Sequence, residues 1–249
     1  DTAQAPGSKY KDKFSGTIGD IGGYSLNYHK HINTGEGGIL VTNDDKLAER
    51  MRLIRNHAEV VIKDRNISDL SNLIGHNFRL GEIECAIGIE QLKKLDDIVI
   101  LKKQLANFLT NEIINLDGLH IPYIPNDRDH VYYVYPIILD TKKLGVSREK
   151  IVSAIKSEGL DIAVGYQNLH LLPTFQKKIA FGNNNYPWKI DNEMSKISYE
   201  RGICPIAEEL HESTFISIGM CAYELNIDDM KLIAEVFLKV WNNMDALKD

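Results

Sequence analysis

Residues 25–38 read SLNYHKHINTGEGG, and this stretch decides how the chain is interpreted. It follows a short apolar run at residues 23–26 and ends in glycines, which is typical of a strand that enters a tight functional loop. Its lysine, Lys30, has two interpretations. It is either a solvated surface residue or an amine that forms a Schiff base or binds phosphate, because partial desolvation makes an ammonium nucleophilic. The residues alone leave both open.

Strand and helix patterns alternate on the C-terminal side of this loop. Residues 39–42 predict a strand, and Asp44 is placed to cap a helix whose apolar residues follow at helical spacing. A polar, irregular loop at residues 59–76 precedes one long predicted helix over about 82–115. Alternation of this kind indicates an α/β fold.

The character of the sequence changes after the long helix. A β-branched and aromatic strand is predicted over residues 130–139, a capped helix over 147–158 and a last helix over 228–246. We therefore expect two domains, residues 1–115 and residues 116–249, with the long helix as the link between them.

The composition is that of an ordinary globular protein with a core, 43% hydrophobic and 26% charged. With 35 acidic against 29 basic residues, the chain offers no electrostatic reason to expect nucleic acid or an anionic membrane as a partner. Three widely spaced cysteines indicate neither a disulfide framework nor a zinc site, so we expect a cytoplasmic protein. No run approaches the roughly 20 apolar residues that span a bilayer, and no signal peptide is recognisable.

The string at residues 25–38 resembles the lysine segment of the DegT/DnrJ/StrS family of pyridoxal-phosphate (PLP) sugar aminotransferases, where a serine, four residues, a lysine and T-G-E-G-G recur in this order. The resemblance implies the aspartate-aminotransferase-like fold, PLP fold type I: part of a large domain with a mixed, mostly parallel sheet, and a C-terminal α+β small domain. It implies that Lys30 is the catalytic residue that holds PLP as a Schiff base. It also implies that Ser25 donates to the cofactor phosphate, the alternative being a turn-capping hydroxyl.

The first residues, DTAQA at positions 1–5, resemble the family's D-x-A-Q/H-A segment. There the aspartate keeps the pyridine nitrogen protonated, so that the ring accepts electrons from the substrate. By this resemblance Asp1 and Gln4 bind the cofactor, Gln4 at the ring or its phenolic oxygen. The distance of 29 residues from Asp1 to Lys30 is the family's usual one. Standing alone, Asp1 would be interpreted as a frayed terminal carboxylate.

Residues 75–88, GHNFRLGEIECAIG, resemble the family's G-x-N-x-R-M-x-x-I/L-x-A-A-I-G. The resemblance implies a homodimer with shared active sites, in which Asn77 binds the cofactor phosphate of the neighbouring subunit and Arg79 reaches its substrate site. The alternatives are that Asn77 caps the helix starting near Gly81 and that Arg79 is a surface cation.

Later matches are looser. Residues 165–173, GYQNLHLLP, resemble the family's H-Y-x-P-L-H-x-x-P, with Gly165 in place of the leading histidine. His170 is either a substrate-site residue or a histidine satisfied by backbone partners, and His31 is a further substrate-site candidate. Residues 204–208, CPIAE, resemble a segment of some relatives, to which we assign no chemical role.

The resemblance implies transfer of an amino group, with glutamate as the expected donor, to a nucleotide-linked keto sugar. Two alternatives stay open: a deoxysugar dehydratase of the same family, in which a histidine replaces the lysine, and a non-catalytic dimer that keeps the fold. The register set by T-G-E-G-G places Lys30, and neither His29 nor His31, at the key position. Relatives carry a phosphate loop and a ring-stacking residue upstream of the aspartate. We therefore expect that the N-terminal part of such an enzyme is missing and that these 249 residues alone bind PLP poorly.

Overall fold

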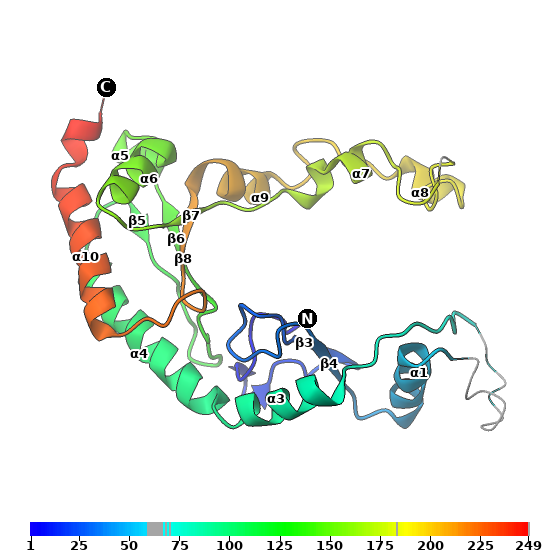
Figure 1. Ribbon diagram of the computed structural model, residues 1–249. Coiled ribbons are helices and arrows are strands. Elements are labelled where there is room, and N and C mark those ends of the chain that lie inside the picture. Colours follow the sequence, from blue (N-terminus) through cyan, green and yellow to red (C-terminus); the bar gives the residue numbers. More distant parts are fainter. Residues whose placement is uncertain (59–66, 68, 70, 183, 249) are drawn as a thin grey trace. The chain divides into compact units, whose positions relative to one another are not determined.

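A computed structural model describes residues 1–58, 67, 69, 71–182 and 184–248 (Figure 1). The chain forms two compact units, and segments distant in the sequence contribute to each. Unit 1 comprises Asp1–Asn107, Tyr123–Val134 and Met220–Asn226, and unit 2 comprises Phe108–Pro122, Tyr135–Gly219 and Ile227–Asp249. The division of the protein into domains at residue 115 stays a prediction. The loop predicted at residues 59–76 lies largely outside the described residues.

Unit 1 contains two antiparallel hairpins. β1 (Lys9–Tyr10) pairs with β2 (Lys13–Phe14), and β3 (Gly22–Ser25) pairs with β4 (Gly38–Val41). Parallel strands need a crossover connection, usually a helix, and neither pair has one. The parallel strand pairs expected for the large domain are therefore not among the strands described in this unit.

Capping residues set the beginnings of two helices as the sequence predicts. In unit 1, α1 (Asp45–Arg55) follows Asp44, whose carboxylate accepts bonds from two backbone N–H groups of the first turn at 2.8 and 3.0 Å. In unit 2, α6 (Arg148–Ser157) follows Ser147, whose hydroxyl accepts a backbone N–H bond at 3.4 Å. Both caps satisfy donors that a helix end leaves without partners.

The single helix predicted over residues 82–115 is two helices, α3 (Glu82–Leu92) and α4 (Leu95–Ile113). The prediction was wrong at the junction, where the N–H of Lys94 donates to the carbonyl of Gln91, three residues earlier, at 3.0 Å. Such a tightened turn interrupts the α-helical pattern of bonds to the fourth preceding residue. The apolar stripe runs through the break, which is why periodicity does not reveal it.

Unit 2 is built around a four-stranded sheet in the order β5-β6-β8-β7. Its strands are β5 (Leu119–His120), β6 (Val134–Leu139), β7 (Ala163–Val164) and β8 (Phe215–Gly219). Alternate residues of β6 are buried, as expected when one face of a strand lies on a core. Helix α10 (Ile227–Asn242) packs against α6 and contributes to the same core. The fully buried side chains of this core include Tyr135, Ile137, Leu139, Ile151, Ile155, Ile216 and Phe237.

The remaining described elements are short. They are α5 (Thr141–Leu144), η1 (Leu169–Leu171), α7 (Pro173–Gln176), α8 (Asn192–Lys196), α9 (Pro205–Glu209), the π-helical turn η2 (Leu210–Thr214) and η3 (Met244–Leu247). The helix predicted over residues 228–246 is thus α10 followed by η3. Over the described ranges, no helix combines the length and the apolar composition needed to cross a membrane.

Candidate functional site

Lys30 lies in the loop between β3 and β4, the two strands labelled in Figure 1, and hydrogen bonds within this loop close it. The N–H of Leu26 donates to the carbonyl of Gly37 at 2.9 Å, and the N–H of Thr34 donates to the carbonyl of Leu26 at 3.0 Å. Inside this closure, the N–H of Lys30 donates to the carbonyl of Asn27 at 3.0 Å. Because Leu26 and Thr34 are buried, the backbone around Lys30 is held from both sides.

Four of the five T-G-E-G-G residues, Thr34 to Gly37, have a structural reason in this loop. A Cβ at Gly37 would lie 2.8 Å from Oγ1 of Thr34, and Gly35 has φ +86°, so glycine is required at both positions. The hydroxyl of Thr34 donates to the carbonyl of Glu36 at 2.9 Å. The carboxylate of Glu36 in turn accepts a bond from the Asn27 amide at 2.7 Å. The motif therefore shapes the loop that presents the lysine.

The side chain of Lys30 meets an aromatic ring and a pocket. Its Nζ lies 4.6 Å from the ring centroid of Tyr133, which is a cation–π contact. No ion pair or side-chain hydrogen bond of Lys30 is found within the part of the chain that the structure describes. Lys30 lines a pocket of about 590 Å³ in unit 1, together with Tyr28, His31 and Lys102 among others. An amine in this position is available to a ligand.

His31 is buried next to Lys30, with one ring nitrogen bonded and the other without a partner. Its Nε2 lies 2.8 Å from the carbonyl oxygen of Val131, so Nε2 carries the proton and donates. Burial lowers the pKa of His31, and the Val131 bond opposes this only in part. The neutral tautomer leaves Nδ1 as an acceptor that nothing in the described residues satisfies. The structure thus brings His31 to the Lys30 pocket, while its substrate role stays a prediction.

The N-terminal segment is bonded to strand β3. The N–H of Thr2 donates to the carbonyl of Gly23 at 2.8 Å, and this anchors Asp1 to the strand that ends at Ser25. The carboxylate of Asp1 is exposed and accepts a backbone N–H bond two residues on at 2.9 Å, and Gln4 is exposed as well. The Ser25 hydroxyl accepts a backbone N–H bond at 3.2 Å, as in the turn-capping alternative, and its own O–H remains a donor.

Asn77 and Arg79 lie on an extended segment beside the end of α1. Asn77 forms an isolated antiparallel bridge with Asn56, and Nη1 of Arg79 donates to Oδ1 of Asn56 at 2.6 Å. The N-cap of α3 is Gly81, so the alternative in which Asn77 caps this helix is excluded. Both side chains are exposed, and neither lines the Lys30 pocket as the described residues form it. Their cofactor and substrate roles therefore stay predictions.

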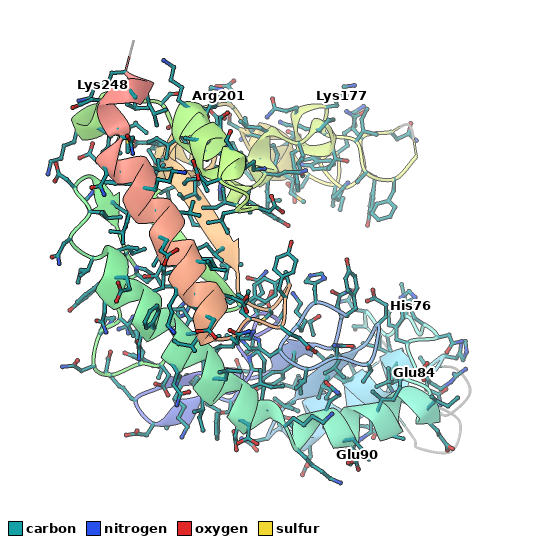
Figure 2. The ribbon with its side chains drawn as sticks, turned by 60° about the vertical axis from the view of Figure 1, so that its left-hand side comes forward. His76, Glu84, Glu90, Lys177, Arg201 and Lys248 are labelled. Carbon is teal, nitrogen blue, oxygen red and sulfur yellow. The ribbon has the colours of Figure 1, made fainter. Side chains whose placement is uncertain are left out.

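In unit 2, His170 is held by a carboxylate. Its Nε2 lies 2.8 Å from Oε1 of Glu208, and both side chains are nearly buried. The N–H groups of Gly202 and Cys204 donate to the same carboxylate, and these bonds, that of Gly202 first, lower the pKa of Glu208. Nη1 of Arg201, a residue labelled in Figure 2, lies 3.9 Å from Oε2 of Glu208. The CPIAE segment thus has a structural role, because it supplies Glu208. The hydrogen-bond partner of the His170 ring is this carboxylate, whereas the structural alternative expected backbone groups.

The departure from the family pattern at Gly165 has a backbone reason. This residue has φ +53°, and a Cβ built on it would lie 2.0 Å from the carbonyl oxygen of His211. The histidine that relatives carry here would therefore not fit this backbone.

Two residues near Lys30 were not found from the sequence: Tyr133, whose ring contacts the amine, and Lys102, which lines the same pocket. Tyr133 lies in the HVYY string at residues 130–133, which the resemblance marks only as a strand, and Lys102 lies within a helical pattern that carries no motif. Neither has a local signal that connects it with Lys30. In the described residues, no group of three or more His, Cys, Asp or Glu side chains could hold a metal ion.

Comparisons with known proteins bear on the family. The model of the DegT/DnrJ/EryC1/StrS aminotransferase family matches residues 1–202. The chain is 32% identical over 178 residues to the GDP-perosamine synthase of Escherichia coli O157:H7, covering 72% of this chain and 46% of that protein. It is 29% identical over 206 residues to the putative pyridoxal phosphate-dependent aminotransferase EpsN of Bacillus subtilis (strain 168), covering 82% and 50%. The chain spans about half the length of the curated relatives it matches.

Comparison with solved structures bears on the fold. The aminotransferase from Psychrobacter cryohalolentis superposes with a TM-score of 0.77 at 23% identity, covering 98% of this chain and 61% of that one. The Helicobacter pylori aminotransferase PseC gives a TM-score of 0.73 at 24% identity, covering 98% and 59%. This likeness confirms the expected PLP fold type I.

Proposed function

The chain belongs to the DegT/DnrJ/EryC1/StrS aminotransferase family, and we propose that the protein transfers an amino group from glutamate to a nucleotide-linked keto sugar, with PLP as cofactor. The observation that carries the proposal is Lys30. Its loop is held by hydrogen bonds on both sides, and its amine, which makes no ion pair with the described residues, lines a pocket. The name of the GDP-perosamine synthase relative supports a nucleotide-linked sugar as substrate.

The residues present fit the cofactor. Lys30 offers an amine that can bond its aldehyde carbon, and Ser25 has a free O–H for a phosphate oxygen. Asp1 offers an exposed carboxylate for the pyridine nitrogen, on a segment bonded to β3, and Gln4, three residues on, is exposed as well. When bound, PLP supplies a ring that accepts negative charge from the substrate carbon next to the nitrogen.

The chain's own side chains would then transfer a proton and cover the amine that takes it. The Nζ of Lys30 in its neutral form is the base that takes the proton from the Cα of the donor. The ring of Tyr133 lies 4.6 Å from this amine and covers it on one side. His31 stands one residue after the position that the T-G-E-G-G register gives to the lysine, and its Nε2 is bonded to the carbonyl of Val131, which supports an aminotransferase over a dehydratase that uses a histidine at the lysine position.

We assign the cross-subunit roles on the same footing. Asn77 and Arg79 are exposed on one segment, as residues that serve a neighbouring subunit of a two-fold homodimer must be. In this assignment Asn77 binds the cofactor phosphate of the partner and Arg79 contributes to the partner's substrate site, and His170 keeps its assignment as a substrate-binding residue.

Covalent labelling of the whole protein tests the proposal. The protein is loaded with PLP, reduced with borohydride and digested, and the peptides are mapped by mass spectrometry. The label is expected on Lys30 and absent from Lys94 and Lys102, the other two lysines of the same pocket. The Lys30→Ala variant should lose amino transfer from glutamate by several orders of magnitude. A label on either other lysine, or transfer that survives in the variant, would overturn the proposal.

A further inference from the structure

A second lysine of the Lys30 pocket is buried without a counter-charge. Lys102 lies on the unit 1 part of α4, and it is only 7% exposed. Its Nζ donates one hydrogen bond, at 3.3 Å, to the carbonyl oxygen of Tyr223. An ammonium has three donors, and no ion pair of Lys102 occurs within the described ranges. A buried charge in this state is unfavourable unless something pairs with it.

The neighbours of Lys102 do not supply the missing charge. Burial raises the pKa of Cys221 to about 11, so its thiol is neutral near pH 7. Burial also lowers the pKa of Lys102, and Glu224 opposes this only from a distance beyond an ion pair. His31 is neutral as well, as argued above. The site therefore has room for an anion from outside the chain.

The pocket itself has the charge and the walls for an organic acid. Three lysines face one carboxylate, that of Glu224, among its lining residues. Ile98, Leu101 and Leu225 give it apolar walls beside these charges. A volume of about 590 Å³ lies within the range that small-molecule sites occupy. A bare inorganic anion would match the lysines and leave the apolar walls in contact with water.

We propose that this pocket binds a carboxylate on a short carbon chain, and that Lys102 is the residue that holds it. The inference rests on the proposed function in one respect, because the acid is assigned as the amino donor, whose amino group then lies towards Lys30. Lys102 would thus select donors that carry a second carboxylate. It is a substrate-binding residue for which the sequence carries no motif.

Glutarate is the probe, because it has two carboxylates on a short chain and no amino group that can react. Binding to the whole protein is measured by calorimetry in the wild type, in Lys102→Met and in Lys103→Met. Lys103 is the matched control, since it is the next residue on the helix and pairs with Asp129 at 3.0 Å on the surface. Loss of a charge-assisted hydrogen bond should weaken glutarate binding about tenfold or more in Lys102→Met and leave Lys103→Met unchanged.

Thermal melting separates this role from a structural one. Methionine has a similar length and removes an unpaired buried charge, so Lys102→Met should melt no lower than the wild type without ligand, and glutarate should stabilise only the wild type. A variant that melts well below the wild type in buffer, or that binds glutarate as well as the wild type, would overturn the inference. So would inorganic phosphate that binds more tightly than glutarate. If borohydride labels Lys30 and Lys102→Met binds glutarate as well as the wild type, this inference alone is refuted. If Lys30 is not labelled and Lys102→Met loses glutarate binding, the proposed function alone is refuted.

Discussion

Replacement of Gly165 by alanine is expected to destabilise unit 2 far more than the same change at Gly159. Both glycines have positive φ, +53° and +91°, so alanine at either position costs about 1–2 kcal/mol in backbone strain. At Gly159 nothing lies within 4 Å of the added Cβ. At Gly165 the carbonyl oxygen of His211 lies 2.0 Å away, so the backbone must shift.

That shift has a second consequence. The N–H of Gly165 donates to the carbonyl of Phe215 at 3.0 Å, and the carbonyl of His211 accepts a bond from Arg148 at 2.9 Å. Moving the chain by more than an ångström breaks the first bond and strains the second, at about 1 kcal/mol for the bond and about 1–3 kcal/mol for the overpacking. We therefore expect Gly165→Ala to exceed Gly159→Ala by about 2–4 kcal/mol in loss of unfolding free energy.

Urea denaturation followed by tryptophan fluorescence measures the difference directly. The protein has two tryptophans, Trp188 and Trp241, and both lie in unit 2, so the signal reports the unit that contains both glycines. The midpoint of unfolding should fall in the order wild type, Gly159→Ala, Gly165→Ala, with similar slopes. Equal losses of unfolding free energy in the two variants would refute this reasoning. They would show that the positive φ alone sets the cost and that the backbone at residue 165 moves away from the His211 carbonyl at no cost.

Three further predictions follow from the site. Burial lowers the pKa of His31, so as the pH falls through about 6.5 this histidine takes up a proton in the unfolded chain before it does so in the folded protein, and the free energy of unfolding should drop. Thermal melting at several pH values should show this drop, and the drop should be smaller in His31→Gln. Mixing inactive Lys30→Ala and Asn77→Ala subunits should restore part of the amino transfer, since one of the two sites in each mixed dimer has both wild-type residues. If verified heterodimers show no recovery of activity, the active sites are not shared between subunits. Glu208→Gln should lower the melting temperature, because an amide cannot replace a carboxylate that accepts several N–H bonds. The same change at the exposed neighbour Glu209 should leave the melting temperature unchanged, and equal melting temperatures in the two variants would contradict this reasoning.

Local signals explain the parts of the fold that the sequence predicts well. Asp44 and Ser147 cap helices where expected because a cap depends only on the next three residues. The interruption between α3 and α4 has no such signal, since neither glycine nor proline stands there and the apolar stripe continues. The antiparallel pairing of β3 with β4 likewise depends on a loop that closes on itself, which family resemblance does not show.

The sequence by itself determined the family, the fold class and the identity of Lys30 as the residue to test, because T-G-E-G-G and its spacing to the lysine are local features of one loop. Only the tertiary structure decided what surrounds that lysine. His31 meets Val131 across 100 positions, and Lys102 meets Tyr223 across 121. Such contacts exist only after distant segments have packed together, and the burial that then raises the free energy of an unpaired charge has no counterpart in any short stretch of sequence.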